Sequence, residues 1–149
     1  MKSVALALVV CGCTSSASDS NDPTNNPQLP GDYTVHREMT GYEACPPYEE
    51  PLDFALSITS ACATSPVDYA TCEEITTAGG VLQFKLDEQW NAGAGVPSDY
   101  PRYVIATVDF MLHQDGDNLG GTAAGGYVYD TPTTGDDCRF NWNVTATRN

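Results

Sequence analysis

The chain has 149 residues, of which 20 are Asp or Glu and only 6 are Lys or Arg, giving a formal net charge of −14 at pH 7. This balance argues against a nucleic-acid partner, because binding to phosphates needs basic residues that displace counterions. It also argues against electrostatic docking to anionic lipid. The length suits one domain with a modest core rather than several domains.

Residues 1–12 are expected to be a cleaved signal peptide. Lys2 supplies a positive start, and residues 3–10 (SVALALVV) form an apolar run. This run is far too short to cross a bilayer, which takes about 20 residues, but it suits the apolar core of a secretory signal. Two other interpretations stay open: an ordinary secretory signal cut near Ala17, and a frayed N-terminal strand.

Cys13 follows Val10-Cys11-Gly12, and this sequence resembles the lipobox of bacterial lipoproteins. The resemblance implies that Cys13 carries several acyl chains, such as palmitate, and that they hold the protein lastingly on a membrane. Lipidation at Cys11 would instead place the bulky Val10 at the cleavage position. Thr14 is not the Asp that retains lipoproteins at the inner membrane, so the resemblance implies anchoring in the bacterial outer membrane.

The rest of the chain divides into a tether and a domain. Residues 13–30 are expected to be the lipidated Cys and a disordered tether, because Ser, Asn, Asp, Pro and Thr dominate and large apolar side chains are almost absent. Such a segment cannot bury enough surface to offset its ordering entropy. Residues 31–149 are expected to form one β domain.

Alternation of apolar and polar residues predicts about six strands in this domain. Arg37 interrupts the apolar face of the first strand. Asp115-Gly116-Asp117-Asn118 is typical of a hairpin turn, and the glycines of the strand after it suggest bulges or sharp curvature. Ser65-Pro66-Val67-Asp68 is typical of a helix start and predicts a short helix to about Ile75. The predicted strands are residues 33–39, 52–59, 82–90, 104–112, 119–129 and 138–147.

These elements predict a mainly β fold: an antiparallel meander forming a small barrel or sandwich, with one short helix. The opening segment Gly31–Val35 and the closing segment Trp142–Arg148 resemble small uncharacterised lipoproteins with a lipocalin-like β-barrel. The resemblance covers the ends of the domain and the lipobox, and it implies a fold more than an activity.

The four cysteines of the domain are expected to form two disulfides, as is usual in a small exported domain. Three connectivities are possible. We favour Cys62–Cys72, which would tie the predicted helix to the strand before it, with Cys45–Cys138 tying the loop after the first strand to the last strand. A zinc site is the rival interpretation, but no Cys-x-x-Cys occurs and neither histidine lies at ligand spacing from a Cys.

The sequence predicts no catalytic residue, no metal site and no cofactor, and enzyme activity is not expected. No Gly-x-Ser-x-Gly occurs, and His36 and His113 fit exposed strand positions. The Asp115 turn fails as a calcium loop, because its twelfth position is Gly126 rather than a bidentate Glu. The acidic pairs Glu49-Glu50 and Glu73-Glu74 are interpreted as solvated charges.

The aromatic residues suggest one binding role. Trp90, Trp142, Tyr103 and Tyr127 could line an apolar ligand cavity inside a barrel, although aromatic side chains more often simply fill a core. Two functions therefore stay open for a membrane-anchored envelope lipoprotein. One is binding of a small apolar ligand; the other is a structural or protein-interaction module at the cell surface, without a ligand.

Overall fold

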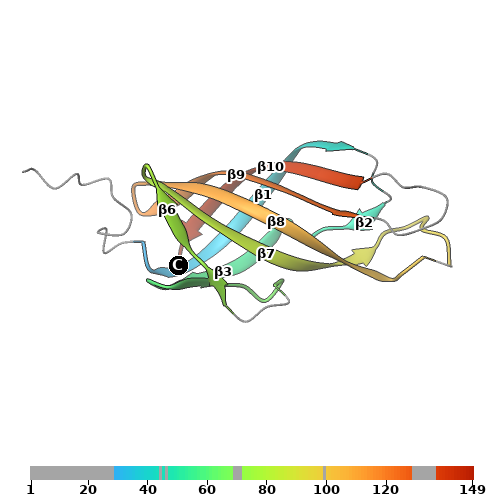
Figure 1. Ribbon diagram of the computed structural model, residues 1–149, viewed down its shortest axis with the longest axis horizontal. Coiled ribbons are helices and arrows are strands. Elements are labelled where there is room, and N and C mark those ends of the chain that lie inside the picture. The colour runs from blue at the N-terminus through green and yellow to red at the C-terminus, as the bar shows by residue number, and fades with distance from the viewer. Residues whose placement is uncertain (1–28, 44, 46, 69–71, 99, 129–136) are drawn as a thin grey trace, which may run out of the picture.

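Strands make up all the regular secondary structure in the described part of the chain (Figure 1). The computed structural model describes residues 29–43, 45, 47–68, 72–98, 100–128 and 137–149. The predicted signal, Cys13 and nearly all of the predicted tether lie outside these residues. The strands are β1 (Gly31–Glu43), β2 (Tyr48–Glu49), β3 (Asp53–Ile58), β4 (Cys62–Thr64), β5 (Glu73–Glu74), β6 (Thr76–Ala78), β7 (Val81–Ala92), β8 (Tyr103–Asp115), β9 (Asn118–Val128) and β10 (Asp137–Arg148).

One antiparallel sheet contains all ten strands. Its order is β2-β7-β8-β9-β10-β1-β3-β4-β5, with β6 paired to the start of β7. The four long strands β7 to β10 follow one another as a meander, and β1 closes against β10. The predicted mainly β, antiparallel fold is confirmed.

The sheet curls until strands from distant positions face each other. Arg37 on β1 contacts Glu88 on β7, although β8, β9 and β10 lie between these strands in the sheet order. An isolated bridge between Asp68 and Glu88 brings the connection after β4 against β7. No ladder closes the sheet within the described residues.

Period-two alternation places every second residue of the long strands in the core, because successive side chains of a strand point to opposite faces. The charged residues Arg37 and Glu88 take inward positions in this pattern. On three of these strands the buried members are Leu82, Phe84, Leu86, Glu88 and Trp90 (β7), Ala106, Val108, Phe110 and Leu112 (β8), and Cys138, Phe140, Trp142, Val144 and Ala146 (β10).

The β8–β9 hairpin turns at the predicted residues, and Gly116 there has a φ of 62°, a conformation that glycine adopts without strain. The register of β9 runs without a shift along both neighbours, so the glycines do not form bulges. They allow close approach instead. A Cβ on Gly121 would lie 2.1 Å from the Met111 carbonyl oxygen, and one on Gly126 would lie 2.1 Å from the Cys138 carbonyl oxygen.

The predicted short helix from Ser65 to about Ile75 is not found in the described part of the chain. No helix occurs among the described residues, and the predicted span holds a turn and β5, with residues 69–71 outside the described part. The Ser65 hydroxyl accepts from the Val67 N–H and donates to the Ala55 carbonyl, which ties the turn to β3. Ladder pairing of Glu73 and Glu74 with β4 then replaces helical hydrogen bonding.

Candidate functional site

The two disulfides join the pairs predicted from the sequence. Cys45 bonds Cys138 at a Cα–Cα distance of 4.6 Å and ties the chain after β1 to the start of β10. Cys62 bonds Cys72 at 5.5 Å and ties β4 to the residue before β5. The first bridge therefore holds the end of β1 beside the last strand, and the second holds the outermost strands of the sheet.

Three of the four aromatic residues predicted to bind a ligand meet inside the curled sheet. Trp90 lies edge-to-face with Trp142 at a ring distance of 6.0 Å and with Tyr127 at 6.2 Å. Phe140 completes the group, 4.7 Å from Trp90. Tyr103 does not join them, since it lies 55% exposed at the start of β8.

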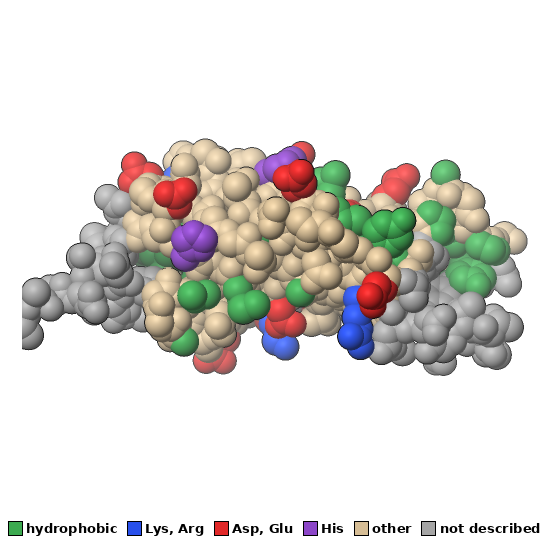
Figure 2. Space-filling view, turned by 90° about the horizontal axis from the view of Figure 1, so that it is seen from above, with side chains coloured by type: hydrophobic (Ala, Val, Ile, Leu, Met, Phe, Trp, Pro, Cys, Tyr) green, Lys and Arg blue, Asp and Glu red, His purple; other side chains and the backbone are tan. Residues whose placement is uncertain are grey.

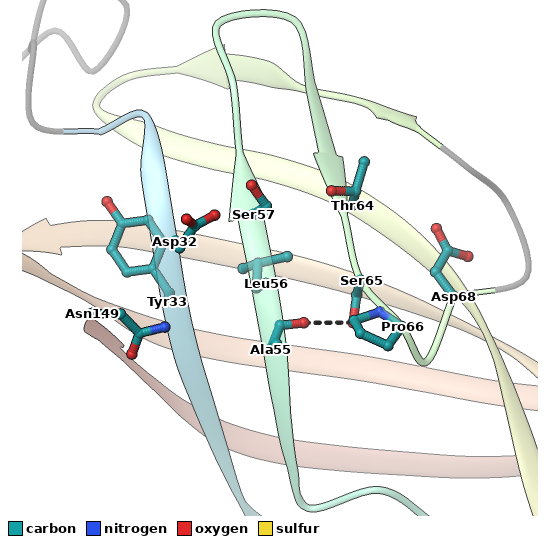
Figure 3. Close-up of a pocket in the computed structure, with 10 residues that line it drawn as sticks. All are labelled: Asp32, Tyr33, Ala55, Leu56, Ser57, Thr64, Ser65, Pro66, Asp68 and Asn149. Atoms are coloured by element: carbon teal, nitrogen blue, oxygen red, sulfur yellow. Dashed lines mark hydrogen bonds between the residues drawn. The ribbon is translucent and has the colours of Figure 1, made fainter.

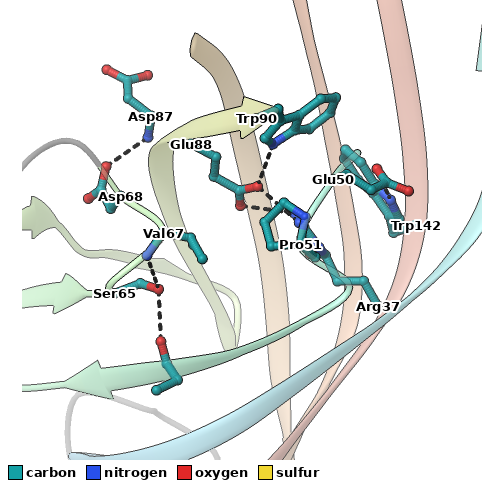
Figure 4. Close-up of polar contacts among 11 residues, drawn as sticks. Arg37, Glu50, Pro51, Ser65, Val67, Asp68, Asp87, Glu88, Trp90 and Trp142 are labelled. Carbon is teal, nitrogen blue, oxygen red and sulfur yellow. Dashed lines mark hydrogen bonds and ion pairs between the residues drawn. The ribbon is translucent and has the colours of Figure 1, made fainter. Parts of the chain in front are cut away.

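Beside these rings lies a buried ion pair that the sequence did not reveal. The Arg37 Nη1 and Nη2 atoms each donate to one oxygen of Glu88 at 2.9 Å. The Glu88 Oε2 atom also accepts from the Trp90 indole N–H at 3.0 Å (Figure 4). Phe54 and Trp142 pack against the guanidinium with ring centroids 5.0 and 4.7 Å away. Both charges are thus paired, hydrogen-bonded and removed from water.

The same arginine holds the crossing segment, Glu50–Leu52, by which the chain passes from β2 to β3. Its Nε and Nη2 atoms donate to the Pro51 carbonyl, and its backbone N–H donates to the Leu52 carbonyl at 2.8 Å. The Trp142 indole donates to Glu50 Oε2 at 3.0 Å (Figure 4). Arg37 therefore links β1, β7 and the crossing segment through one side chain.

Burial is the largest influence on the pKa values of the Glu88 and Glu50 carboxyls. It raises the pKa of Glu88, while the charge and hydrogen bonds of Arg37 and the Trp90 indole act in the opposite direction. Burial also raises the pKa of Glu50, which Arg37 and the Trp142 indole lower and which Glu88 raises further. The donors of the Arg37 side chain are taken up within the protein, by Glu88 and by the Pro51 carbonyl.

The sequence analysis did not predict this network, although two charged residues at inward strand positions pointed to part of it. Arg37 and Glu88 stand at inward positions of alternating runs, where a charge is unexpected. Buried charges are normally paired, so two such positions of opposite sign would have predicted each other. Glu50 carried no such signal, because it lies outside any strand and beside the exposed Glu49.

Next to the network, β1 has a free edge, Glu38–Glu43. The ladder between β1 and β3 ends at His36 and Asp53, and the last hydrogen bond is the one from Arg37 to Leu52. Beyond it, the described residues give β1 ladder partners in β10 only. Alternating burial also ends at Arg37, and Met39 and Tyr42 are 38% and 68% exposed although they pair with the buried Trp142 and Phe140.

Two surface pockets lie around the Ser65–Asp68 turn. One, of about 560 Å³, is lined by β1, β3, the turn and Asn149 (Figure 3). The other, of about 470 Å³, lies between the turn, the crossing segment and β7. The Ser65 hydroxyl donates to the Ala55 carbonyl, and an Asp68 oxygen accepts from the Asp87 N–H at 2.9 Å, so these two side chains hold the turn against β3 and β7.

Acidic side chains are spread over the surface seen in Figure 2, where few basic ones appear. His36 and Asp53 form an exposed pair, 2.6 Å apart. The described residues contain no group of three His, Cys, Asp or Glu side chains that could hold a metal, and no helix among them is long and apolar enough to span a bilayer. No family model, curated protein or solved structure matches the chain.

Proposed function

We propose that this chain is an exported lipoprotein of the bacterial cell envelope whose β domain is a structural or protein-interaction module. One observation carries the choice. The side chains that a ligand cavity would need, those of Trp90, Trp142 and Tyr127, pack against one another and against the Arg37–Glu88 pair. Opening a cavity there would separate aromatic contacts and hydrogen bonds in a low-dielectric core, which is costly.

For the fold, the proposal is a small, lipocalin-like barrel that opens along one seam. The Arg37–Glu88 contact and the Asp68–Glu88 bridge support it, because both join parts of the sheet that a flat arrangement would keep apart. The seam runs where β3 leaves β1 and the crossing segment takes its place. A seam held by side chains leaves backbone groups at the strand edge for a partner.

For the location, the proposal is lipid anchoring at Cys13, in the outer membrane. The lipobox-like sequence and the polar segment after it support this location. The two disulfides support an oxidising compartment, where such bonds form and persist. The polar segment would then serve as a spacer between the membrane and the domain.

Binding of a small apolar ligand is the second candidate. It is favoured by the convergence of three of the four predicted aromatic residues on one interior region. A ligand would have to displace packed side chains there, or use Tyr103 on the outside. We rank it below the interaction module for that reason.

A hydrophobic-dye titration separates the two candidates. Anilinonaphthalene sulfonate is added to the intact, disulfide-bonded protein while tryptophan emission is followed. We expect no saturable binding, since Trp90 and Trp142 are inaccessible. A protein with a known cavity for this dye is the positive control for dye response. Saturable binding of one dye per chain with quenching of tryptophan would establish the cavity and overturn the proposal.

The anchor has its own matched pair of variants in the host. Cys13→Ser should abolish both acylation and cleavage of the signal, whereas Cys11→Ser should be acylated and cleaved like the unchanged chain. Loss of acylation in Cys11→Ser alone would place the lipidation site at Cys11. Acylation of neither the unchanged chain nor the two variants would contradict the lipoprotein assignment.

A further inference from the structure

The free edge, Glu38–Glu43, points to one kind of partner. On this edge β1 carries backbone groups that no neighbouring strand among the described residues takes up. An edge of this kind is where an extended peptide adds a strand to a sheet, with main-chain hydrogen bonds giving affinity and alternate side chains giving specificity. We propose that the free edge binds an extended segment of basic and apolar residues as an added β-strand; this rests on the interaction-module function and names its partner.

Three exposed apolar side chains beside the free edge favour apolar residues in the partner strand. Met39 and Tyr42 occupy inward register positions of β1, yet Met39 is 38% exposed and Tyr42 is 68% exposed. Leu52, 44% exposed, lies across the seam, where its carbonyl takes the last hydrogen bond from β1. Apolar side chains of an added strand would cover these residues and continue the alternation that ends at Arg37. Hydrophobic side chains also gather at this end of the molecule in Figure 2.

Two acidic side chains on the free edge favour basic residues in the partner strand. Glu38 and Glu43 flank the exposed Met39 and Tyr42, and both are exposed. Arg139 lies opposite Glu43 in the β1–β10 register, whereas the uncharged Asn143 lies opposite Glu38, so Glu38 supplies most of the local negative charge of the edge. Opposite charges on neighbouring strands stabilise pairing, and like charges destabilise it.

The same charges disfavour a second copy of this chain as the occupant. Edge-to-edge pairing of two copies would bring the free-edge glutamates together and join two strongly acidic domains. The register also shifts between Met39 and Gly41, and such a bulge limits indiscriminate pairing. A basic strand is repelled neither by the free-edge glutamates nor by the acidic domain as a whole.

Labelled seven-residue peptides test the proposal against the purified, disulfide-bonded domain. The first alternates Lys and Val, the second alternates Glu and Val, and the third is the Lys-Val peptide with N-methyl groups on one edge. Fluorescence anisotropy should show saturable binding of the first, with a Kd of about 10–100 µM. The second and third should bind at least about tenfold more weakly.

Two charge-reversed proteins locate the site. Glu38→Lys with Glu43→Lys should weaken binding of the Lys-Val peptide by at least about tenfold, with circular dichroism confirming that the domain stays folded. Asp115→Lys with Asp117→Lys, at the β8–β9 turn, makes the same charge change elsewhere and should preserve most of the binding. Amide hydrogen exchange should slow at residues 38–43 when the peptide is bound.

Equal loss in both variants would reduce the effect to net charge and overturn the proposal. Absence of binding, or exchange protection elsewhere, would overturn it too. Concentration-dependent protection of residues 38–43 without any peptide would assign the edge to a second copy. None of these outcomes decides the proposed function, which instead falls if the dye titration finds a cavity.

Discussion

Arg37 on β1 and Glu88 on β7 form a two-pronged ion pair across the interior, with both N–O distances at 2.9 Å and both side chains removed from solvent. The pair joins strands that are far apart in the sheet order. Its remaining hydrogen bonds reach Trp90 and the crossing segment, so it connects the aromatic core to the chain between β2 and β3. Four predictions follow from this arrangement and from the strands around it.

Removing one partner of the pair should be strongly destabilising. Glu88→Ala leaves an uncompensated guanidinium in the core, and we expect the free energy of unfolding to fall by about 3–5 kcal/mol. The double variant Arg37→Met with Glu88→Leu removes both charges and should cost much less than the two single changes added together. Urea titrations followed by far-ultraviolet circular dichroism measure Glu88→Ala, the double variant and its two single variants, Arg37→Met and Glu88→Leu. Additive losses would show that the two residues are not coupled.

Glu50 should make stability depend on pH. Its pKa is raised in the folded protein, chiefly by burial, so the folded state holds this proton above the ordinary glutamate value of 4.5. The folded protein binds more protons than the unfolded one in that window, so the contribution of Glu50 to the free energy of unfolding falls as pH rises.

Glu50→Gln should flatten this slope and increase stability at neutral pH, because an amide oxygen still accepts from Trp142. Glu49→Gln, at the exposed neighbour, is the matched control for losing one carboxyl. Urea titrations at several pH values between 4.5 and neutrality measure the slope. An unchanged slope in Glu50→Gln would contradict the assignment.

Substitution by alanine should affect stability differently at Gly120 and at Gly121, two adjacent residues of β9. Gly121→Ala would push a methyl group to 2.1 Å from the Met111 carbonyl oxygen, and we expect a loss of about 1–3 kcal/mol or more. At Gly120 the nearest atom lies 3.8 Å away, so Gly120→Ala should change stability by less than about 0.5 kcal/mol. Thermal unfolding of the two variants gives the comparison. Equal effects would show that close strand approach does not explain the glycines.

The two disulfides should differ in their contribution to stability. Cys45–Cys138 joins residues 93 positions apart, and chain entropy gives such a bridge about 4–5 kcal/mol. Cys62–Cys72 spans 10 positions and should contribute about 3 kcal/mol. Paired Cys→Ala variants, compared by urea titration, should keep this order. A larger loss from the shorter loop would mean that strain or unfolded-state structure dominates.

Local patterns were enough to predict the long strands. Alternation at Leu82–Trp90 and Val104–Leu112 fixed both the strands and their buried faces, and the turn residues at Asp115–Asn118 fixed the hairpin between β8 and β9. Both favoured disulfide pairs are found. Cys45–Cys138 was expected because the first and last strands were expected to be neighbours, as β1 and β10 are. Cys62–Cys72 was expected to tie down a helix that does not occur among the described residues, so this pair was right for another reason. These features depend on residues near in sequence or on a simple topological rule.

The free edge of β1 could not be predicted, since it depends on contacts distant in sequence. Nothing local indicates that Tyr48 and Glu49 pair with the end of β7, which draws the chain away from β1 and frees its edge. Leu52 continued an apolar alternation but lies before β3, 44% exposed. The Ser65–Asp68 sequence suits a helix start and a turn equally, and tertiary pairing decided between them.

The proposed location in the cell envelope is tested most directly by the intact mass of the protein. The protein is purified from detergent-solubilised membranes of its own host, and its mass is measured before and after reduction and alkylation. We predict a chain that lacks residues 1–12 and carries acyl chains on Cys13, with four alkylated thiols appearing only after reduction. A soluble, unacylated chain that retains residues 1–12 would contradict the assignment to the cell envelope.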